Sequence, residues 1–142
     1  MGSAVNECRE SEGESFPHLL RVRYDVDRGV AGTVFGANTL RFVMLDGFRF
    51  ELGPEGYLLI YNSIDRPGML AKAGSVLSHH DANIAGVSLG RTEIGQNTLT
   101  VMNIDADIPG VGMKGLLGLE GATNLRLVRL DFGFSFYLFF IK

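Results

Sequence analysis

The sequence predicts an α+β protein in which a βαββαβ unit follows a short antiparallel β segment. Three observations predict this class. Before residue 53, short apolar runs follow one another without helical periodicity between them. Gly53-Pro54-Glu55-Gly56 then interrupts the apolar pattern, as a domain boundary does. Beyond this stretch, the patterns come in the order strand, helix, strand, strand, helix, strand.

The composition is that of a globular protein and argues against several function classes. Of the 142 residues, 46% are hydrophobic and 20% are charged, and the formal net charge is -3. This charge balance gives no broad basic surface, so we expect no nucleic-acid partner. The only cysteine, Cys8, leaves no internal disulfide and no cysteine-based metal site. The longest apolar run, residues 132–141, is about half the length of a membrane span, so we expect no membrane partner.

The first third of the chain predicts a lead-in and a small sheet. Residues 1–15 are acidic and polar with almost no apolar periodicity, so we expect a flexible lead-in. Alternating apolar residues then predict strands at 19–26, 30–35, 40–45 and 48–52. Asp46-Gly47, between the last two, is typical of a tight hairpin turn. We expect antiparallel strands with no helix between them over residues 16–53.

Residues 57–130 predict a ferredoxin-like layer, with four antiparallel strands and both helices on one face. We expect strands at 57–61, 83–89, 98–104 and 124–130, and helices at 67–80 and within 108–119. Gly110, Gly112, Gly115 and Gly118 weaken the second helix, which we expect to be short, frayed or late in starting. Helices on one face leave the other sheet face, or an edge strand, in need of a partner.

The stretch before the first helix predicts a small-anion site. Asp65 is a candidate N-cap, Pro67 suits the first helical turn, and Gly68 permits close approach of a ligand to the backbone. Free N–H groups at a helix start attract anions. A free amino acid needs an acceptor for its ammonium group, which Asp65 supplies, and donors for its carboxylate, which the N–H groups from Gly68 to Leu70 supply. Asn83, at the start of the next strand, supplies both.

Simpler interpretations of the same residues stay open. Asp65 serves only as a helix cap in many such contexts, and Asn83 can simply end a turn.

The run Gly110 to Gly115 satisfies G-x-G-x-x-G, but no parallel βαβ unit and no ribose-binding acid accompany it. We expect no metal site, because adjacent His79 and His80 point about 100° apart on a helix. The aromatic residues 131–142 predict an apolar tail of unassigned role.

Several motifs together resemble one family. Residues 57–91, with DRPG at 65–68 and NIAG at 83–86, resemble the ACT domain of D-3-phosphoglycerate dehydrogenase, as do LTVMNID at 99–105 and LRLVRL at 125–130. Before them, VAGTVFG at 30–36 and FVMLDGFRFEL at 42–52 resemble the end of the intervening, allosteric substrate-binding domain in the long form of that enzyme. The resemblance covers roughly residues 16–130.

The resemblance implies a regulatory module of serine biosynthesis. Such ACT domains pair into dimers through edge strands and helices and bind an amino acid, L-serine in the best-known members, between two subunits. The resemblance implies that Ser63, Asp65 and Asn83 contact the ligand. With the N–H donors at the helix start and the residue after Asn83, the predicted effector site comprises Ser63, Asp65, Gly68, Met69, Leu70, Asn83 and Ile84. Ser63 departs from the family, in which a larger His or Tyr often stands there.

The resemblance also implies what the chain does by itself. We expect no catalysis and no cofactor in this chain, with NAD belonging to a parent dehydrogenase that oxidises 3-phosphoglycerate. The implied location is cytoplasmic, or plastidial if the parent carries a transit peptide. Two alternatives remain: a dimerisation module that ignores amino acids, and the corresponding part of an L-serine dehydratase beta subunit.

Overall fold

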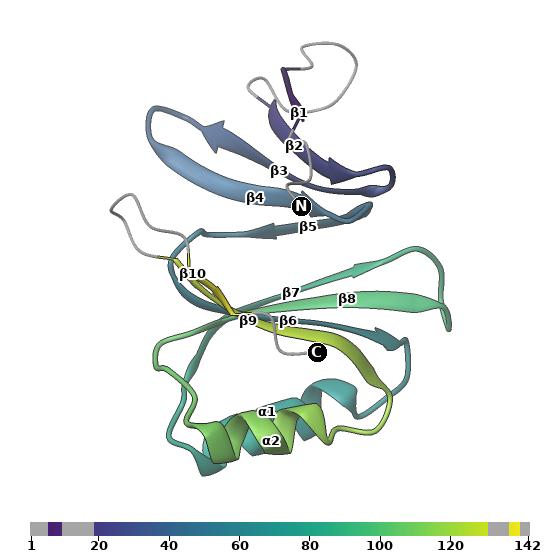
Figure 1. Ribbon diagram of the computed structural model, residues 1–142, viewed down its shortest axis with the longest axis vertical. Coiled ribbons are helices and arrows are strands. Elements are labelled where there is room, and N and C mark those ends of the chain that lie inside the picture. Colours follow the sequence, from purple (N-terminus) through teal and green to yellow (C-terminus); the bar gives the residue numbers. More distant parts are fainter. Residues whose placement is uncertain (1–5, 10–18, 131–136, 140–142) are drawn as a thin grey trace. The chain divides into compact units, whose positions relative to one another are not determined.

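The computed structural model describes residues 6–9, 19–130 and 137–139 (Figure 1). The chain divides into two compact units, Met1–Pro54 and Glu55–Lys142. The division falls within the Gly- and Pro-containing stretch at 53–56. Most of the predicted lead-in and of the predicted apolar tail lies outside the described residues. None of the described helices is long and apolar enough to cross a membrane.

The first unit is a single antiparallel sheet. Its strands are β1 (Asn6–Arg9), β2 (Leu19–Asp25), β3 (Arg28–Phe35), β4 (Thr39–Leu45) and β5 (Phe48–Leu52), in that spatial order. The last four correspond to the four predicted strands. β1 is a correction, because it lies inside the stretch expected to be flexible. It pairs with β2, with Cys8 opposite Arg21, and so satisfies backbone groups that β2 would otherwise expose at the sheet edge.

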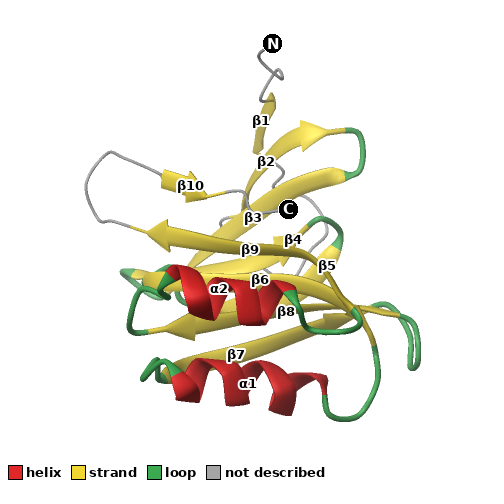
Figure 2. Cartoon of the chain, turned by 60° about the horizontal axis from the view of Figure 1, so that its bottom comes forward, coloured by secondary structure: helices red, strands yellow, loops and turns green. Residues whose placement is uncertain are grey.

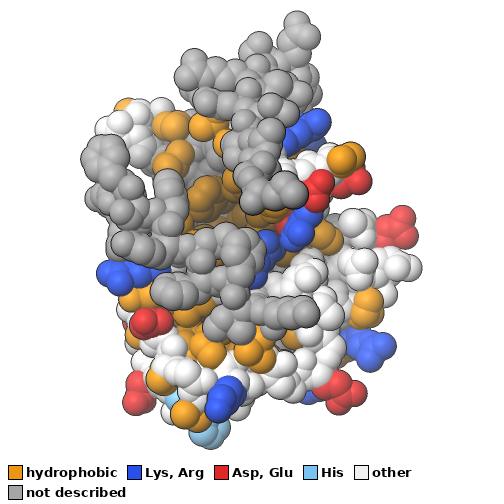
Figure 3. Space-filling model, viewed as in Figure 1, with side chains coloured by type: hydrophobic (Ala, Val, Ile, Leu, Met, Phe, Trp, Pro, Cys, Tyr) orange, Lys and Arg blue, Asp and Glu red, His pale blue; other side chains and the backbone are white. Residues whose placement is uncertain are grey.

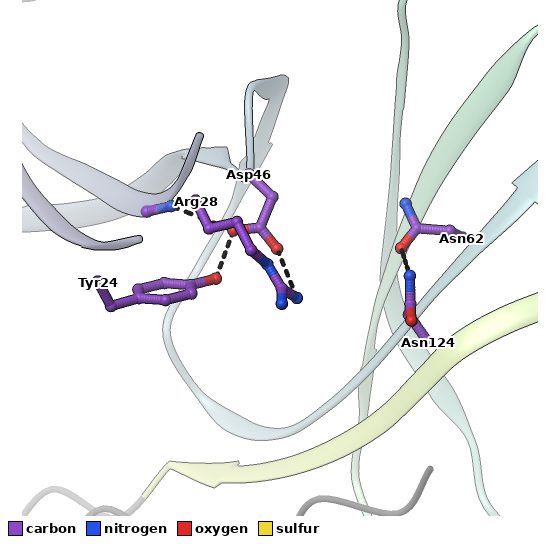
Figure 4. Close-up of polar contacts among 6 residues, drawn as sticks. Tyr24, Arg28, Asp46, Asn62 and Asn124 are labelled. Carbon is purple, nitrogen blue, oxygen red and sulfur yellow. Dashed lines mark hydrogen bonds and ion pairs between the residues drawn. The ribbon is translucent and has the colours of Figure 1, made fainter. Parts of the chain in front are cut away.

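A carboxylate joins the two hairpin turns at one end of this sheet. Asp46 and Gly47 have φ values of 49° and 84°, as the expected tight hairpin turn requires. The Asp46 carboxylate accepts hydrogen bonds from the Tyr24 hydroxyl and, at 3.1 Å, from the Gly29 N–H (Figure 4). The Arg28 guanidinium lies 3.6 Å from its other oxygen. Asp46 therefore fixes the β2–β3 connection against the β4–β5 turn.

The second unit has the predicted ferredoxin-like topology. Its elements are β6 (Gly56–Ile64), α1 (Met69–His79), β7 (Ile84–Arg91), β8 (Asn97–Ile104), α2 (Gly110–Leu117), β9 (Ala122–Leu130) and β10 (Tyr137–Phe139). The strand order is β10-β9-β6-β8-β7, with all neighbours antiparallel. β6, the first strand of the unit, is therefore central, and β7 is at an edge. Strand β10, which lies within the predicted tail, forms the other edge.

Both helices cover one face of this sheet (Figure 2). Alternate residues of the central strands face them: Leu59 and Tyr61 on β6, with Met102 and Ile104 on β8, belong to one buried cluster with Leu77 of α1. The register pairs Leu59 with Met102 and Tyr61 with Thr100, so these side chains share a face. Near the end of β6, the Asn124 amide donates to the Asn62 side-chain oxygen at 3.3 Å and joins β9 to β6 (Figure 4).

The glycines of α2 allow it to approach α1 closely. A Cβ atom at Gly112 would lie 2.6 Å from Ile108 Cγ2 and 2.8 Å from His80 Cδ2, and one at Gly115 would lie 3.2 Å from Val76 Cγ1. Figure 3 shows pale-blue histidine atoms at the bottom of the view. The helix is short, as expected, with 8 residues against 11 in α1. Its glycines lower helix propensity but let the two helices pack at short range.

Candidate functional site

The start of α1 differs from the sequence prediction. The helix begins at Met69, and its N-cap is Gly68, with φ 92° and no side-chain cap. The Lys72 N–H bonds to the Gly68 carbonyl at 3.0 Å. The prediction that Asp65 caps the helix is wrong, because a turn at Pro67 and Gly68 separates this carboxylate from the first helical N–H groups. Pro67 accordingly precedes the helix instead of lying in its first turn.

The Asp65 carboxylate faces the hairpin between β7 and β8. Its Oδ2 atom accepts hydrogen bonds from Arg91 Nη1 at 3.2 Å and from the Gly95 N–H at 3.3 Å. Its own backbone N–H donates to the Gln96 carbonyl at 2.8 Å. Arg91, which the sequence reading did not select, is therefore the direct ionic partner of a predicted site residue.

A row of polar side chains crosses the sheet beside this ion pair. In the strand register, Ser63 of β6 is opposite Thr98 of β8, and Thr98 is opposite Arg91 of β7. All three lie on the helix-covered face, because they alternate in phase with Tyr61 and Met102. Ser63 is 6% exposed and Thr98 is 5% exposed. Among the described residues, the Thr98 hydroxyl has no hydrogen-bond partner. We call Ser63, Thr98 and Arg91 the polar row.

Asn83 lies in a separate polar pair. Its backbone N–H donates to Asp105 Oδ1 at 3.0 Å, and its side-chain amide donates to Asp105 Oδ2 at 3.1 Å. The Asp105 N–H returns a bond to the Asn83 carbonyl at 3.2 Å. Ile84 follows at the start of β7, opposite Ile104. Asp105 was also missed by the sequence reading, although it directly follows a predicted strand.

The predicted site residues fall into two groups at opposite ends of the sheet. Ser63 and Asp65 lie at the end of β6 where Ile64 is opposite Asn97, and residues 68–70 follow there at the start of α1. Asn83 and Ile84 lie at the other end, where Tyr57 is opposite Ile104. Tyr57 and Ile64, which mark these ends on β6, are seven residue steps apart, or about 23 Å at 3.3 Å per residue. Within one chain, the structure does not bring the two groups together.

The edge strand β7 connects the two groups. Its outer side pairs with no other strand in the part of the chain that the structure describes, and it lies beside α1 (Figure 2). Between Ile84 and Gly90 it carries no charged residue. Its exposed apolar side chains Ile84, Val87 and Leu89 form an apolar edge. Unprotected apolar edge strands are sites where another strand pairs.

Comparison with known proteins shows which families the two units resemble. Residues 57–113 match the family model of the ACT domain. The chain is also similar to D-3-phosphoglycerate dehydrogenases. With the protein from Mycobacterium tuberculosis it is 28% identical over 135 residues, which cover 92% of this chain and 26% of the relative. With that from Bacillus subtilis it is 24% identical over 132 residues, covering 91% of this chain and 25% of the relative.

The relative from Methanocaldococcus jannaschii gives the same result, at 27% identity over 129 residues. The similarity includes both units, since it covers 89% of this chain, but the chain spans about a quarter of the length of these relatives. The family resemblance seen in the sequence is thereby confirmed.

Proposed function

Because the second unit is an ACT domain and the chain resembles part of D-3-phosphoglycerate dehydrogenase, we propose that it is an amino-acid-binding regulatory module. The proposed ligand is a free amino acid, L-serine first among the candidates. The proposed site lies between two copies of the chain. Asp65 and the polar row of one copy face Asn83 and Asp105 of the second.

The position of the two polar groups along one edge strand carries this proposal. Asp65 and Arg91 are at the end of β7, and Asn83 and Asp105 are at its start. If two β7 strands pair antiparallel about a two-fold axis near Val87 and Ser88, the end of each strand meets the start of the other. Each dimer then has two identical composite sites. Groups that are about 23 Å apart in one chain become neighbours across the axis.

The chemistry of the two groups suits a zwitterion. Arg91 and the start of α1 attract a carboxylate, and the carboxylate of Asp105 in the second copy attracts an ammonium group. Each charge-assisted hydrogen bond contributes roughly 1.5–3 kcal/mol. Two or three such bonds support dissociation constants from the micromolar to the millimolar range. This range is suited to sensing a metabolite.

The apolar edge supports pairing independently of any ligand. Ile84, Val87 and Leu89 are each more than a third exposed in the single chain. Strand pairing would satisfy the open backbone groups of β7 and cover these side chains. The dimer is therefore expected to exist before the amino acid binds, and the ligand stabilises it.

The relatives support a proposal about the process that the module serves. They are dehydrogenases about four times the length of the matched region, so we propose that the module regulates an NAD-dependent dehydrogenase of serine biosynthesis. The residues described here supply effector binding and leave hydride transfer to other domains. Each relative reported above is a dehydrogenase. This favours a dehydrogenase over an L-serine dehydratase as the enzyme that the module regulates.

A second candidate function is a dimerisation module that binds no effector. One observation favours it: Asp65 and Asn83 already have partners in the single chain, in Arg91 and Asp105. Such contacts fix loops equally well without a ligand. The two candidates differ in their response to amino acids, since only the first predicts that a ligand changes stability and assembly.

The test uses the full chain in sedimentation velocity and in calorimetric titration with the twenty proteinogenic L-amino acids. We expect a dimer that binds L-serine. Leu89→Lys, on the apolar edge, should give a folded monomer without serine binding. Val111→Lys is the matched control, because Val111 is 73% exposed on α2, away from β7. It should leave both properties unchanged.

Two results would decide against the proposal. A wild-type dimer that binds none of the amino acids favours the dimerisation module. Monomeric Leu89→Lys protein that binds serine as tightly as the wild type shows that the site does not need two copies.

A further inference from the structure

The contacts of Asp65 change the role expected for it. The sequence suggested that this carboxylate receives the ligand's ammonium group. In the structure, one of its oxygens already accepts bonds from Arg91 and from the Gly95 N–H, at 3.2 and 3.3 Å. Both donors belong to the β7–β8 hairpin. The main effect of these bonds is to fix the hairpin and the guanidinium of Arg91 relative to the end of β6.

Arg91 is well placed to bind an anion. Its side chain is 56% exposed, although Nη1 is bound to Asp65. A guanidinium carries five N–H donors in a planar fork that matches a carboxylate. In the strand register Arg91 is opposite Thr98, whose buried hydroxyl has no hydrogen-bond partner among the described residues, and Thr98 is opposite Ser63. Two hydroxyl groups therefore lie in the same row as the guanidinium.

We propose that Arg91 binds the carboxylate of the ligand and that Asp65 acts as a positioning residue for Arg91. This inference rests on the proposed function and specifies its ligand class: amino acids with a free α-carboxylate. Thr98 and Ser63 are the neighbours of Arg91 in the strand register, and their hydroxyl groups are the candidates for a further bond to the ligand. The ammonium group then lies toward Asp105 of the second copy.

The magnitudes favour Arg91 over the start of α1 as the main carboxylate ligand. A helix N-terminus carries about half a unit charge and favours a nearby anion by about two- to fivefold. A charge-assisted bond from a full cation contributes about ten- to a hundredfold in affinity. Pairing of two chains would exclude water from the site and strengthen the interaction with Arg91 further. The helix start therefore contributes less to carboxylate binding than Arg91, and Arg91 accounts for most of the preference for ligands with a carboxylate.

The test compares L-serine with L-serinamide, which lacks the carboxylate charge, by calorimetric titration of the full chain. For the wild type, we expect serinamide to bind about ten- to a hundredfold more weakly than serine. In Arg91→Gln this ratio should fall to about threefold or less, mainly because serine binding weakens. Arg66→Gln is the matched control, since it removes the same charge from an exposed arginine next to Asp65. It should keep the wild-type ratio.

Further variants separate a ligand contact from a structural role. Asp65→Asn should lower serine affinity severalfold while keeping some preference for the carboxylate, because Arg91 is still present. If Arg91→Gln does not fold, Arg91→Lys replaces it. A lysine keeps the charge without the planar fork, so serine should bind severalfold more weakly and serinamide about equally well.

The outcomes distinguish this inference from the proposed function. If the wild type binds no amino acid, both the proposed function and the role of Arg91 in ligand binding are refuted. If the wild type binds serine and Arg91→Gln, or its lysine replacement, keeps the wild-type ratio of serine to serinamide affinity, the role of Arg91 is refuted while effector binding stands. A collapsed ratio in Arg91→Gln with an unchanged ratio in Arg66→Gln supports it.

Discussion

Replacement of Gly112 by alanine tests whether the glycines of α2 are required for helix packing. Alanine gains about 0.8–1 kcal/mol of helix propensity over glycine. At Gly112 the new methyl group would lie 2.6 Å from Ile108 Cγ2 and 2.8 Å from His80 Cδ2, well inside normal contact distance. Forcing an extra carbon into such a site typically costs 1–3 kcal/mol. Ile108 is buried and cannot move freely, so we expect Gly112→Ala to lower the free energy of unfolding by about 1–2 kcal/mol.

The same helix provides graded controls. A Cβ atom at Gly110 meets no heavy atom within 4 Å, so Gly110→Ala should be neutral or slightly stabilising. At Gly115 the nearest atom is 3.2 Å away, and an intermediate effect is expected. Urea unfolding followed by circular dichroism measures all three variants, with the m-value as the check for two-state behaviour. If Gly112→Ala is as stable as Gly110→Ala, close packing is not the reason for the glycine.

Three further substitutions test individual polar groups. Asp46→Asn should lower the free energy of unfolding by about 1–3 kcal/mol, because Asp46 accepts bonds from Tyr24 and Gly29, whereas Asp27→Asn at an exposed position should change little in the same urea titration. Burial raises the pKa of Tyr61 above its ordinary value of 10.0. Because the folded state then holds this proton more tightly than the unfolded state, the contribution of Tyr61 to stability is complete below pH 10 and is lost as the pH rises above it. Tyr61→Phe should therefore be within about 1 kcal/mol of wild type at neutral pH and should lose less stability than wild type above pH 10, and equal losses would contradict the assignment. Thr98→Val removes a buried hydroxyl that has no partner among the described residues, so the unliganded chain should be equally or more stable by thermal denaturation, while serine affinity falls if the polar row contacts the ligand.

The strands and their order were predictable because local patterns determine them. Short apolar runs and, at residues 124–130, alternating apolar residues located every strand of the βαββαβ unit, and the Asp46-Gly47 turn located the last hairpin of the first unit. Strand β1 was not predictable in the same way, because its four residues carry no apolar alternation. It pairs through backbone groups along β2, and such pairing leaves almost no trace in the side chains.

The candidate site was only half predictable, because its contacts are distant in sequence. Asp65 and Arg91 are 26 residues apart, and Asn83 and Asp105 are 22 residues apart. The sequence around Asp65 satisfies the local rule for a helix cap, but the turn at Pro67 and Gly68 directs the carboxylate toward the hairpin instead. The register of three strands decides which side chains lie beside Asp65. A single sequence shows each strand but not their register.

If each effector site needs two copies of the chain, ligand binding and dimerisation must be thermodynamically linked. An effector at a hundred times its dissociation constant stabilises the state that binds it by about 2.7 kcal/mol per site. Two composite sites per dimer give about 5.5 kcal/mol, which lowers the dimer dissociation constant about ten-thousandfold. Sedimentation of a dilution series with and without saturating serine measures this shift. A site contained within one chain predicts no shift at all, so the separation of about 23 Å between the two ends of the sheet has a direct consequence for assembly in solution.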